Sequence, residues 1–74
     1  MLTDAQLGAA FRYYRAEQNI SQEVLAKRVG CGRNTVHRLE IGAGTSLRTL
    51  FEVAEELGHP FSRIVWHAER KARG

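Results

Sequence analysis

Apolar residues recur along this chain at the three- and four-residue spacing of amphipathic helices, in segments separated by breaks of only a few residues. The first segment shows the pattern at positions i, i+3, i+4 and i+7: Leu7, Ala10, Phe11 and Tyr14. No segment alternates apolar and polar residues as a half-buried strand does, and turn dipeptides of the hairpin type are absent. The sequence therefore predicts an all-α fold, a compact bundle of five helices.

Capping residues indicate where the first two helices begin. Thr3 or Asp4 can cap the first helix, which we expect to end near Gln18. Ser21 is a good N-cap for a second helix that starts at Gln22, and an acidic residue in its first turn suits the positive end of the helix dipole. The inner face of this second helix is expected to carry Leu25, Ala26 and Val29.

Glycines and a single proline divide the rest of the chain. Gly30 stands where a helix end favours left-handed backbone, and Gly32 follows it, so the chain should turn sharply before a short third helix from Arg33 to Glu40. The other expected boundaries are Thr45 or Ser46 as the cap of a fourth helix, Gly58 at its end, and Pro60 in the first turn of a fifth. The fourth helix carries a broad apolar stripe: Leu47, Leu50, Phe51, Val53, Ala54 and Leu57.

The length of 74 residues is enough for one domain, which we expect to span 1–74, with a core at about 5–66 and a basic tail at 67–74. A content of 43% hydrophobic and 26% charged residues argues against a disordered chain. No apolar run is long enough to span a membrane, and the N-terminus lacks the layout of a signal peptide. We therefore expect a cytoplasmic protein with no membrane partner.

Charge is distributed unevenly along the chain, although the net charge is only +3. Two basic segments, 21–42 and 61–74, flank an acidic segment at 43–60. This layout is expected when one side of a small protein meets a polyanion and another side avoids it. An ordinary solvated surface of mixed charge would give the same pattern, so charge alone leaves both interpretations open.

The residue types that carry catalysis or bind metals do not form a recognisable set. Cys31 is the only cysteine, so it can form neither an internal disulfide nor a zinc site of the usual spacing, and we expect a small buried side chain there. His37, His59 and His67 are not spaced like metal ligands, and no Ser/His/Asp or paired-carboxylate arrangement is present. We expect no enzymatic activity, no metal and no cofactor.

The third helix has two chemically different faces. At about 100° per residue, Val36 and Leu39 fall on one side, and the opposite side carries Arg33, Asn34, His37 and Arg38. An arginine can donate two hydrogen bonds to guanine and an asparagine can pair similarly with adenine, each worth about 1–3 kcal/mol of discrimination. The pattern indicates a helix that buries one side and reads base edges with the other, with a plain solvated face as the alternative.

Two helices joined by a short turn containing glycine are typical of a motif that places its second helix in the major groove of DNA. The residues that carry a family pattern are Arg15, Ile20, Ser21, Gln22, Glu23, Leu25, Ala26, Val29, Gly30, Thr35, Val36, Leu39, Glu40 and Gly42, then Leu47, Leu50, Ala54, Leu57 and Gly58. From about Leu7 to Val65, the chain resembles the phage-repressor and Cro type of helix-turn-helix protein, also called the xenobiotic-response-element family. The resemblance implies a lambda-repressor-like five-helix fold, with the helix-turn-helix at helices two and three.

The resemblance also implies a set of DNA-binding residues and a partner, double-stranded DNA. Gln22 matches a glutamine that meets the phosphate backbone and helps to fix the first base contact. Arg33, Asn34 and Arg38 match base-reading positions, and Thr35 and His37 match backbone or secondary contacts. A protein of this kind belongs in a prokaryotic cell or a phage genome and associates with the nucleoid when it is bound.

A further match is structural, and three features depart from the family pattern. Arg15 and Glu40 match a partly buried salt bridge between helix one and the end of helix three. Gly32 stands where a serine or threonine cap is usual, and the loop 42–45 lacks the usual basic residues and proline, so phosphate contacts from that loop are doubtful. Ile41 replaces a polar residue, and it either falls past the helix end or touches a thymine methyl group.

The fifth helix presents more apolar surface than a core of this size has to absorb. We interpret its apolar residues as a homodimer interface: Phe61, Ile64, Val65 and Trp66. Repressors of this class usually bind as two-fold dimers. The alternative is that these four residues simply close the core of the monomer.

Taken with the resemblance, these observations predict a sequence-specific transcriptional regulator, a repressor that acts as a homodimer on a palindromic operator. The alternative from another class is an antitoxin-like module that neutralises a toxin protein and regulates its own operon. A third possibility is that the chain is a fragment of a longer regulator with a ligand-sensing domain.

Overall fold

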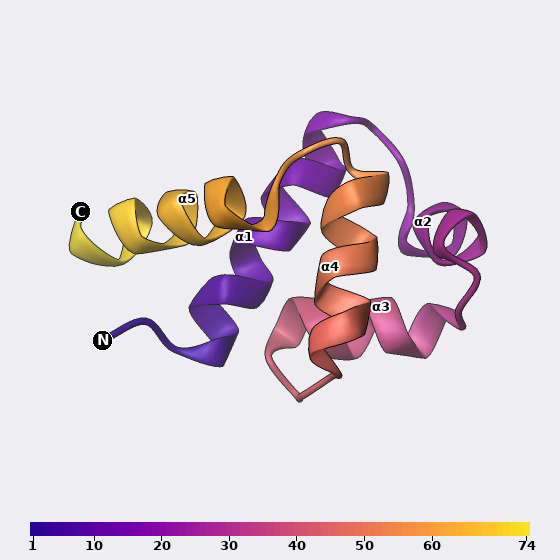
Figure 1. The fold of residues 1–74 in the computed structure, drawn as a ribbon, viewed down its shortest axis with the longest axis horizontal. Coiled ribbons are helices and arrows are strands. Elements are labelled where there is room, and N and C mark those ends of the chain that lie inside the picture. The colour runs from indigo at the N-terminus through magenta and orange to yellow at the C-terminus, as the bar shows by residue number, and fades with distance from the viewer.

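Five α-helices account for most of the chain in the computed structural model, which describes residues 1–74. They are α1 (Asp4–Glu17), α2 (Gln22–Val29), α3 (Arg33–Ile41), α4 (Leu47–Glu56) and α5 (Phe61–Arg73). Figure 1 shows α3 across the lower part of the view, α4 standing above it, and α5 extending to the left beside α1, which it contacts. No residue lies in a strand. The all-α class and the five-helix architecture expected from the sequence are confirmed.

Side-chain caps fix the starts of the first two helices. Of the two candidate caps for α1, Thr3 is the one in use: its Oγ1 accepts from the Gln6 N–H at 3.1 Å, and Gln6 Oε1 accepts from the Thr3 N–H at 2.8 Å. Such a reciprocal pair satisfies two backbone donors that the helix itself leaves free. Ser21 caps α2, since its Oγ accepts from the Val24 N–H at 3.1 Å. Local side-chain chemistry therefore sets both helix starts.

Of the last two helices, α4 begins at one of its two expected caps, and α5 begins slightly later than expected. Ser46, one of the two candidates, caps α4 by accepting from the Thr49 N–H at 3.1 Å. Pro60 is not in the first turn of α5 but immediately before it, as the N-cap residue, with extended backbone. In that position its carbonyl accepts from the Arg63 N–H at 2.9 Å and closes the first turn. No helix combines the length and the apolar character needed to cross a membrane.

The core lies where the five helices meet, and it consists of apolar side chains, of which Phe11 is the largest that is fully buried. α1 packs against α3 and α5, α2 against α3 and α4, and α4 against α5. The buried members are Ala10, Phe11, Leu25, Ala26, Val36, Leu39, Val53, Ala54, Leu57, Ile64 and Ala68. Residues 67–73, described above as a basic tail, continue α5, and Ala68 among them is buried. The packed part of the fifth helix therefore extends beyond residue 66.

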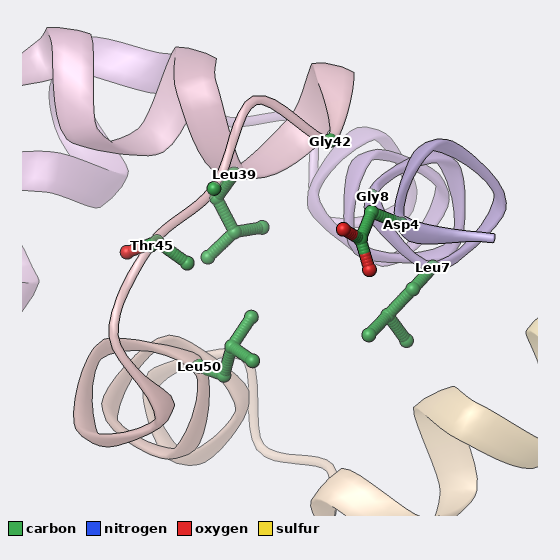
Figure 2. Close-up of a pocket in the computed structure, with 8 residues that line it drawn as sticks. Asp4, Leu7, Gly8, Leu39, Gly42, Thr45 and Leu50 are labelled. Carbon is green, nitrogen blue, oxygen red and sulfur yellow. The ribbon is translucent and has the colours of Figure 1, made fainter.

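A small cavity of about 100 Å³ lies where α1 meets α3 and the loop that follows α3. Figure 2 shows three leucine side chains, Leu7, Leu39 and Leu50, directed toward this space from α1, α3 and α4. Its remaining lining residues are Asp4, Gly8, Gly42, Gly44 and Thr45. The cavity is therefore a gap beside the close contact of α1 and α3. It lies on the buried side of α3.

Candidate nucleic-acid interface

The turn between α2 and α3 is built from backbone hydrogen bonds around a left-handed glycine. Gly30 has a φ of 89°, and the N–H groups of Gly30 and Cys31 both donate to the Ala26 carbonyl, at 2.8 and 2.9 Å. This arrangement ends α2 and redirects the chain within two residues. Gly32 then occupies the N-cap of α3 without a side-chain hydrogen bond. As the sequence indicates, α3 begins without the bond that a serine or threonine would supply.

The two faces of α3 have different environments. Val36 is fully buried and Leu39 is 3% exposed, so this side of the helix belongs to the core. The opposite side, called here the outward face of α3, consists of exposed residues: Arg33, Asn34, His37 and Arg38. Thr35, between the two sides, is half-buried. The structure therefore brings two arginines, an asparagine and a histidine onto one solvent-facing surface.

Arg38 is exposed, but its side chain has a partner within the protein. Its Nη2 donates to the Ala43 carbonyl at 3.0 Å, and the Ala43 N–H donates in turn to the Arg38 carbonyl at 2.9 Å. These two bonds hold the start of the loop after α3 against the last turn of the helix. Arg33 and Asn34, in the first turn, have no such bond and are free to contact a ligand.

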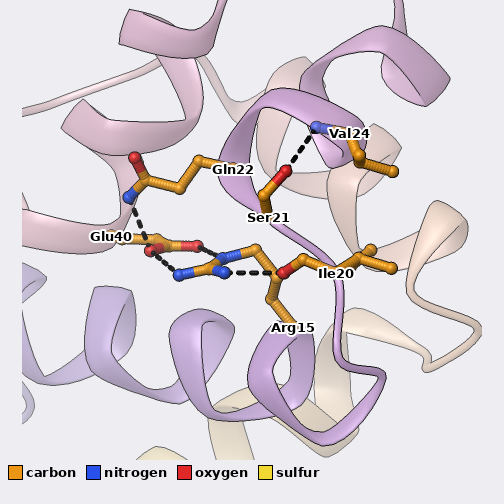
Figure 3. Close-up of polar contacts among 6 residues, drawn as sticks. All are labelled: Arg15, Ile20, Ser21, Gln22, Val24 and Glu40. Carbon is orange, nitrogen blue, oxygen red and sulfur yellow. Dashed lines mark hydrogen bonds and ion pairs between the residues drawn. The ribbon is translucent and has the colours of Figure 1, made fainter.

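A buried carboxylate links the first three helices behind this surface. Glu40 has a side chain that is only 2% exposed, and it accepts from Arg15 Nε at 2.6 Å and from Arg15 Nη2 at 3.1 Å. Arg15 Nη1 donates to the Ile20 carbonyl at 2.7 Å, and Gln22 Nε2 donates to Glu40 Oε1 at 2.9 Å. Figure 3 shows the contacts from Arg15 and Gln22 converging on Glu40, with Arg15 also bonded to Ile20. The salt bridge expected from the resemblance is thus present, with Gln22 as an additional partner.

Cys31, in the turn between α2 and α3, is half-buried. Burial, and to a lesser degree the negative charge of Glu52, raise the pKa of its thiol above the usual value. A thiol in this environment is protonated at neutral pH and is a poor nucleophile. No cluster of three or more His, Cys, Asp and Glu residues in the structure could hold a metal ion.

The four residues proposed for a dimer interface do not lie in one environment. Ile64 is fully buried and packs in the core, so it cannot form part of an exposed interface, which corrects that expectation. Phe61 and Val65 are half-buried, and Phe61 packs against Phe51 with ring centroids 5.1 Å apart. Trp66 is 56% exposed. Of these four residues, only Trp66 and the outer edges of Phe61 and Val65 remain as apolar surface.

Sequence reasoning missed two exposed apolar residues on α4 and left the place of a third, Ile41 of α3, open. Leu47 and Phe51 on α4 are 60% and 50% exposed, and Ile41 at the end of α3 is 55% exposed. The sequence of α4 already indicated this exposure, because five apolar positions in a ten-residue helix form a wider stripe than a single buried face needs. Ile41 is the last residue of α3, so it lies within the helix and outside the core.

A family model described as helix-turn-helix matches residues 11–64, which include all of α2, α3 and α4. The chain belongs to this family, the helix-turn-helix proteins of the phage-repressor and Cro type. The family consists of DNA-binding transcriptional regulators and is not a family of enzymes. For this helix-turn-helix protein, α2 and α3 are therefore the two helices of the DNA-binding motif.

Two curated proteins are similar to this helix-turn-helix chain. One is the HTH-type transcriptional regulator PrtR of Pseudomonas aeruginosa, 40% identical over 50 residues, a match that covers 68% of the chain and 20% of PrtR. The other is the uncharacterized HTH-type transcriptional regulator MJ0272 of Methanocaldococcus jannaschii, 42% identical over 48 residues, with 64% and 73% covered. The chain therefore matches about a fifth of PrtR and most of MJ0272.

A solved structure supports the arrangement of the helices. The crystal structure of ClgR, the clp gene regulator from C. glutamicum, superposes on this helix-turn-helix protein with a TM-score of 0.83 and 28% sequence identity. The match covers 96% of this chain and 92% of the ClgR chain. The shared fold therefore extends over nearly the whole of both chains.

Proposed function

We propose that this protein is a transcriptional repressor that binds a palindromic operator in double-stranded DNA as a homodimer, with α3 in the major groove. The observation that carries the proposal is the division of α3 into a fully buried side and an outward face of hydrogen-bonding side chains. An α-helix fits the major groove of B-form DNA, where each base pair presents a distinct pattern of donors and acceptors. The helix-turn-helix family and the relatives named as transcriptional regulators support the same function.

Arg33 and Asn34 are proposed to read base edges. They lie in the first turn of α3, and the N-terminal residues of a recognition helix are the ones that contact bases. Gln22, the first residue of α2, is proposed to contact DNA where that helix crosses the backbone. Secondary contacts are assigned to Thr35 and His37. Arg38 is also assigned a secondary contact, in place of the base-reading role that the resemblance implies, because its guanidinium is bonded to the Ala43 carbonyl.

The distribution of charge agrees with this placement. The last turn of α2 carries Lys27 and Arg28, both exposed, close in sequence to the outward face of α3. The acidic residues Glu52, Glu55 and Glu56 are exposed on α4. Basic groups beside the recognition helix attract phosphate and speed association with DNA.

Competition between a selected and a random duplex at about 150 mM salt tests the proposal, because sequence-independent binding is weak under these conditions. Arg33→Ala should lose about 1–3 kcal/mol of binding to the selected duplex and relax the preference at one base pair. Arg12→Ala, which removes an exposed arginine of α1, is the matched control and should keep the preference. Equal affinity of the wild-type protein for both duplexes would contradict the proposal.

The proposed homodimer uses the exposed part of α5, centred on Trp66. Sedimentation equilibrium of the free protein and of its operator complex tests it. Trp66→Ala should weaken self-association, whereas Leu47→Ala, a change at an equally exposed apolar residue of α4, should not. A monomer at all concentrations and on DNA would contradict the homodimer. A stable complex with one different protein would favour the antitoxin interpretation instead.

A further inference from the structure

The carboxylate of Glu40 is buried where α1, α2 and α3 meet, and two different residues donate hydrogen bonds to it. Arg15 donates to both carboxylate oxygens, at 2.6 Å from Nε to Oε2 and at 3.1 Å from Nη2 to Oε1. Gln22 donates from Nε2 to Oε1 at 2.9 Å. Because Arg15 already neutralises the carboxylate, the bond from Gln22 is not required to balance its charge.

This bond determines how the Gln22 amide is oriented. An ionised carboxylate can only accept hydrogen bonds, so the part of the amide that faces Glu40 has to be the NH₂ group. The amide is planar, and its Oε1 therefore points in a different direction. Figure 3 shows the Gln22 nitrogen directed at Glu40 and the Gln22 oxygen on the side away from it. Gln22 is half-buried at the first residue of α2, the helix that precedes the turn into α3.

We propose that Glu40 is a positioning residue for DNA recognition, which holds the Gln22 amide so that its Oε1 acceptor faces the DNA. This inference rests on the proposed function, because it takes the start of α2 to lie against DNA. A phosphate oxygen only accepts hydrogen bonds, so it cannot pair with Oε1. The exocyclic amino groups of adenine and cytosine are donors in the major groove and can pair with it.

The assignment changes the role that the family resemblance implies for Gln22. Its side chain contributes to base discrimination through one base amino group. A phosphate contact at this end of α2 falls to the remaining donors, which are the second Nε2–H of Gln22 and the backbone N–H groups of the helix start. Glu40 acts on this contact only through Gln22 and does not touch DNA.

Glu40→Gln tests the proposal, because the new amide offers Gln22 both a donor and an acceptor and no longer imposes one orientation. We expect the variant to lose about tenfold of its preference for one base pair, measured by competition among duplexes that differ at single positions. Arg15→Lys is the control. It keeps the positive charge and the Glu40 carboxylate, but a lysine cannot reproduce the pair of hydrogen bonds that the guanidinium makes to the two carboxylate oxygens. The variant should therefore lower Tm and leave the base preference unchanged.

A measurement without DNA separates this inference from the proposed function. In the NMR spectrum of the free wild-type protein, one Nε2 proton of Gln22 should exchange slowly with solvent, because it is bonded to a buried carboxylate. Glu40→Gln should lose most of that protection, and Arg15→Lys should retain it. A wild-type protein with no protected Gln22 proton rejects the fixed amide, whereas a protected proton with no base preference on DNA leaves the fixed amide standing and rejects the proposed function, and with it the positioning role.

The remaining outcomes are also decisive. A folded Glu40→Gln variant with its full base preference would show that Glu40 serves only the stability of the fold. The same conclusion follows if Arg15→Lys loses the preference equally. If Glu40→Gln does not fold, Gln22→Met removes the amide at similar size and should lose about tenfold at the same base pair. An even loss of affinity for all duplexes would instead assign Gln22 to phosphate and overturn the proposal.

Discussion

Gly8 of α1 lies directly against the backbone of Glu40 in α3. A Cβ atom at Gly8 would come within 2.5 Å of the Glu40 carbonyl oxygen and 2.7 Å of its carbonyl carbon, and it would also clash with the Leu39 carbonyl. These are rigid backbone atoms, so no side chain can move to make room. The absence of a side chain at Gly8 thus allows α1 and α3 to approach closely enough for Arg15 to reach the Glu40 carboxylate.

Gly8→Ala should therefore destabilise the protein by about 1–3 kcal/mol or more, since forcing an extra carbon into a packed site usually costs this much. The added helix propensity of alanine, about 1 kcal/mol, offsets only part of this cost. Urea denaturation followed by circular dichroism measures the free energy of unfolding. Ala9→Gly, one position along on the exposed side of α1, is the control and should cost about 1 kcal/mol through helix propensity alone. A Gly8→Ala variant as stable as the wild type would show that α1 and α3 can separate freely.

The ion pair between Arg15 and Glu40 should be strongly coupled in a double-mutant cycle. Breaking one partner of a buried pair leaves the other charge uncompensated, so Arg15→Ala and Glu40→Ala should each cost about 3–5 kcal/mol in the free energy of unfolding. The double variant should cost less than the sum of the two, because neither charge is then left behind. Additive losses in the urea titrations would show that the two side chains act independently. Arg12→Ala, at an exposed position of the same helix, should change stability by no more than about 0.5 kcal/mol.

Gly32→Ser should stabilise α3 by roughly 0.5–1 kcal/mol, through a side-chain cap and a less flexible unfolded chain. The substitution fits, because Gly32 has a φ of −81° and a Cβ atom there would meet no neighbour within 4 Å. Gly32→Ala is the matched control, since alanine restricts the unfolded chain in the same way but cannot cap. Thermal unfolding should place the serine variant above both the wild type and the alanine variant. Equal melting temperatures for serine and alanine would mean that the hydroxyl does not cap the helix.

The starts of the helices could be predicted from the sequence because capping is local. Ser21 bonds to a backbone group three residues away, and Gly30 adopts its left-handed conformation next to the helix that it ends. The outward face of α3 was predictable for a related reason. The angle between residues on a helix depends only on their spacing, so Val36 on the buried side fixes where Arg33 points.

What the sequence could not supply are the contacts between helices. Helical spacing alone could not separate Ile64, which is buried in the core, from Trp66, which is 56% exposed, because the position of α1 beside α5 is set by tertiary packing. The bond between Gln22 and Glu40 joins residues 18 positions apart, and neither residue type indicates the other. The close approach at Gly8 was likewise invisible, since glycine in a helix marks a contact only when the neighbouring helix is known.

Alkaline pH should destabilise the fold through Cys31. Burial, then the charge of Glu52, raise the pKa of this thiol in the folded protein, so the folded state holds the proton more tightly than the unfolded chain does. The resulting stability is complete below the pKa of the unfolded chain and is lost as pH rises through the higher pKa of the folded protein. The Tm of the wild type should therefore fall relative to the Tm of Cys31→Ala as the pH rises above neutral.

Thiol chemistry gives an independent check on Cys31. A disulfide reagent should react with the folded protein more slowly at pH 7 than with the urea-unfolded chain, because less of the thiol is ionised. Fast reaction of the native protein at pH 7 would contradict a raised pKa.

Arg38→Ala should weaken binding to selected and random duplexes by similar factors, whereas Arg33→Ala should mainly affect the selected duplex. The reason is that Arg38 lies in the last turn of α3 with its guanidinium bonded to the Ala43 carbonyl, so it stabilises the loop after the helix and, in the proposed complex, adds positive charge near DNA. The loss of this exposed bond should cost no more than about 1 kcal/mol of stability. Removing one phosphate contact should also reduce the salt dependence of binding by about one unit of slope. Arg38→Lys keeps the charge and should recover most of the affinity, and a loss of preference at a single base pair in Arg38→Ala would instead identify Arg38 as a base-reading residue.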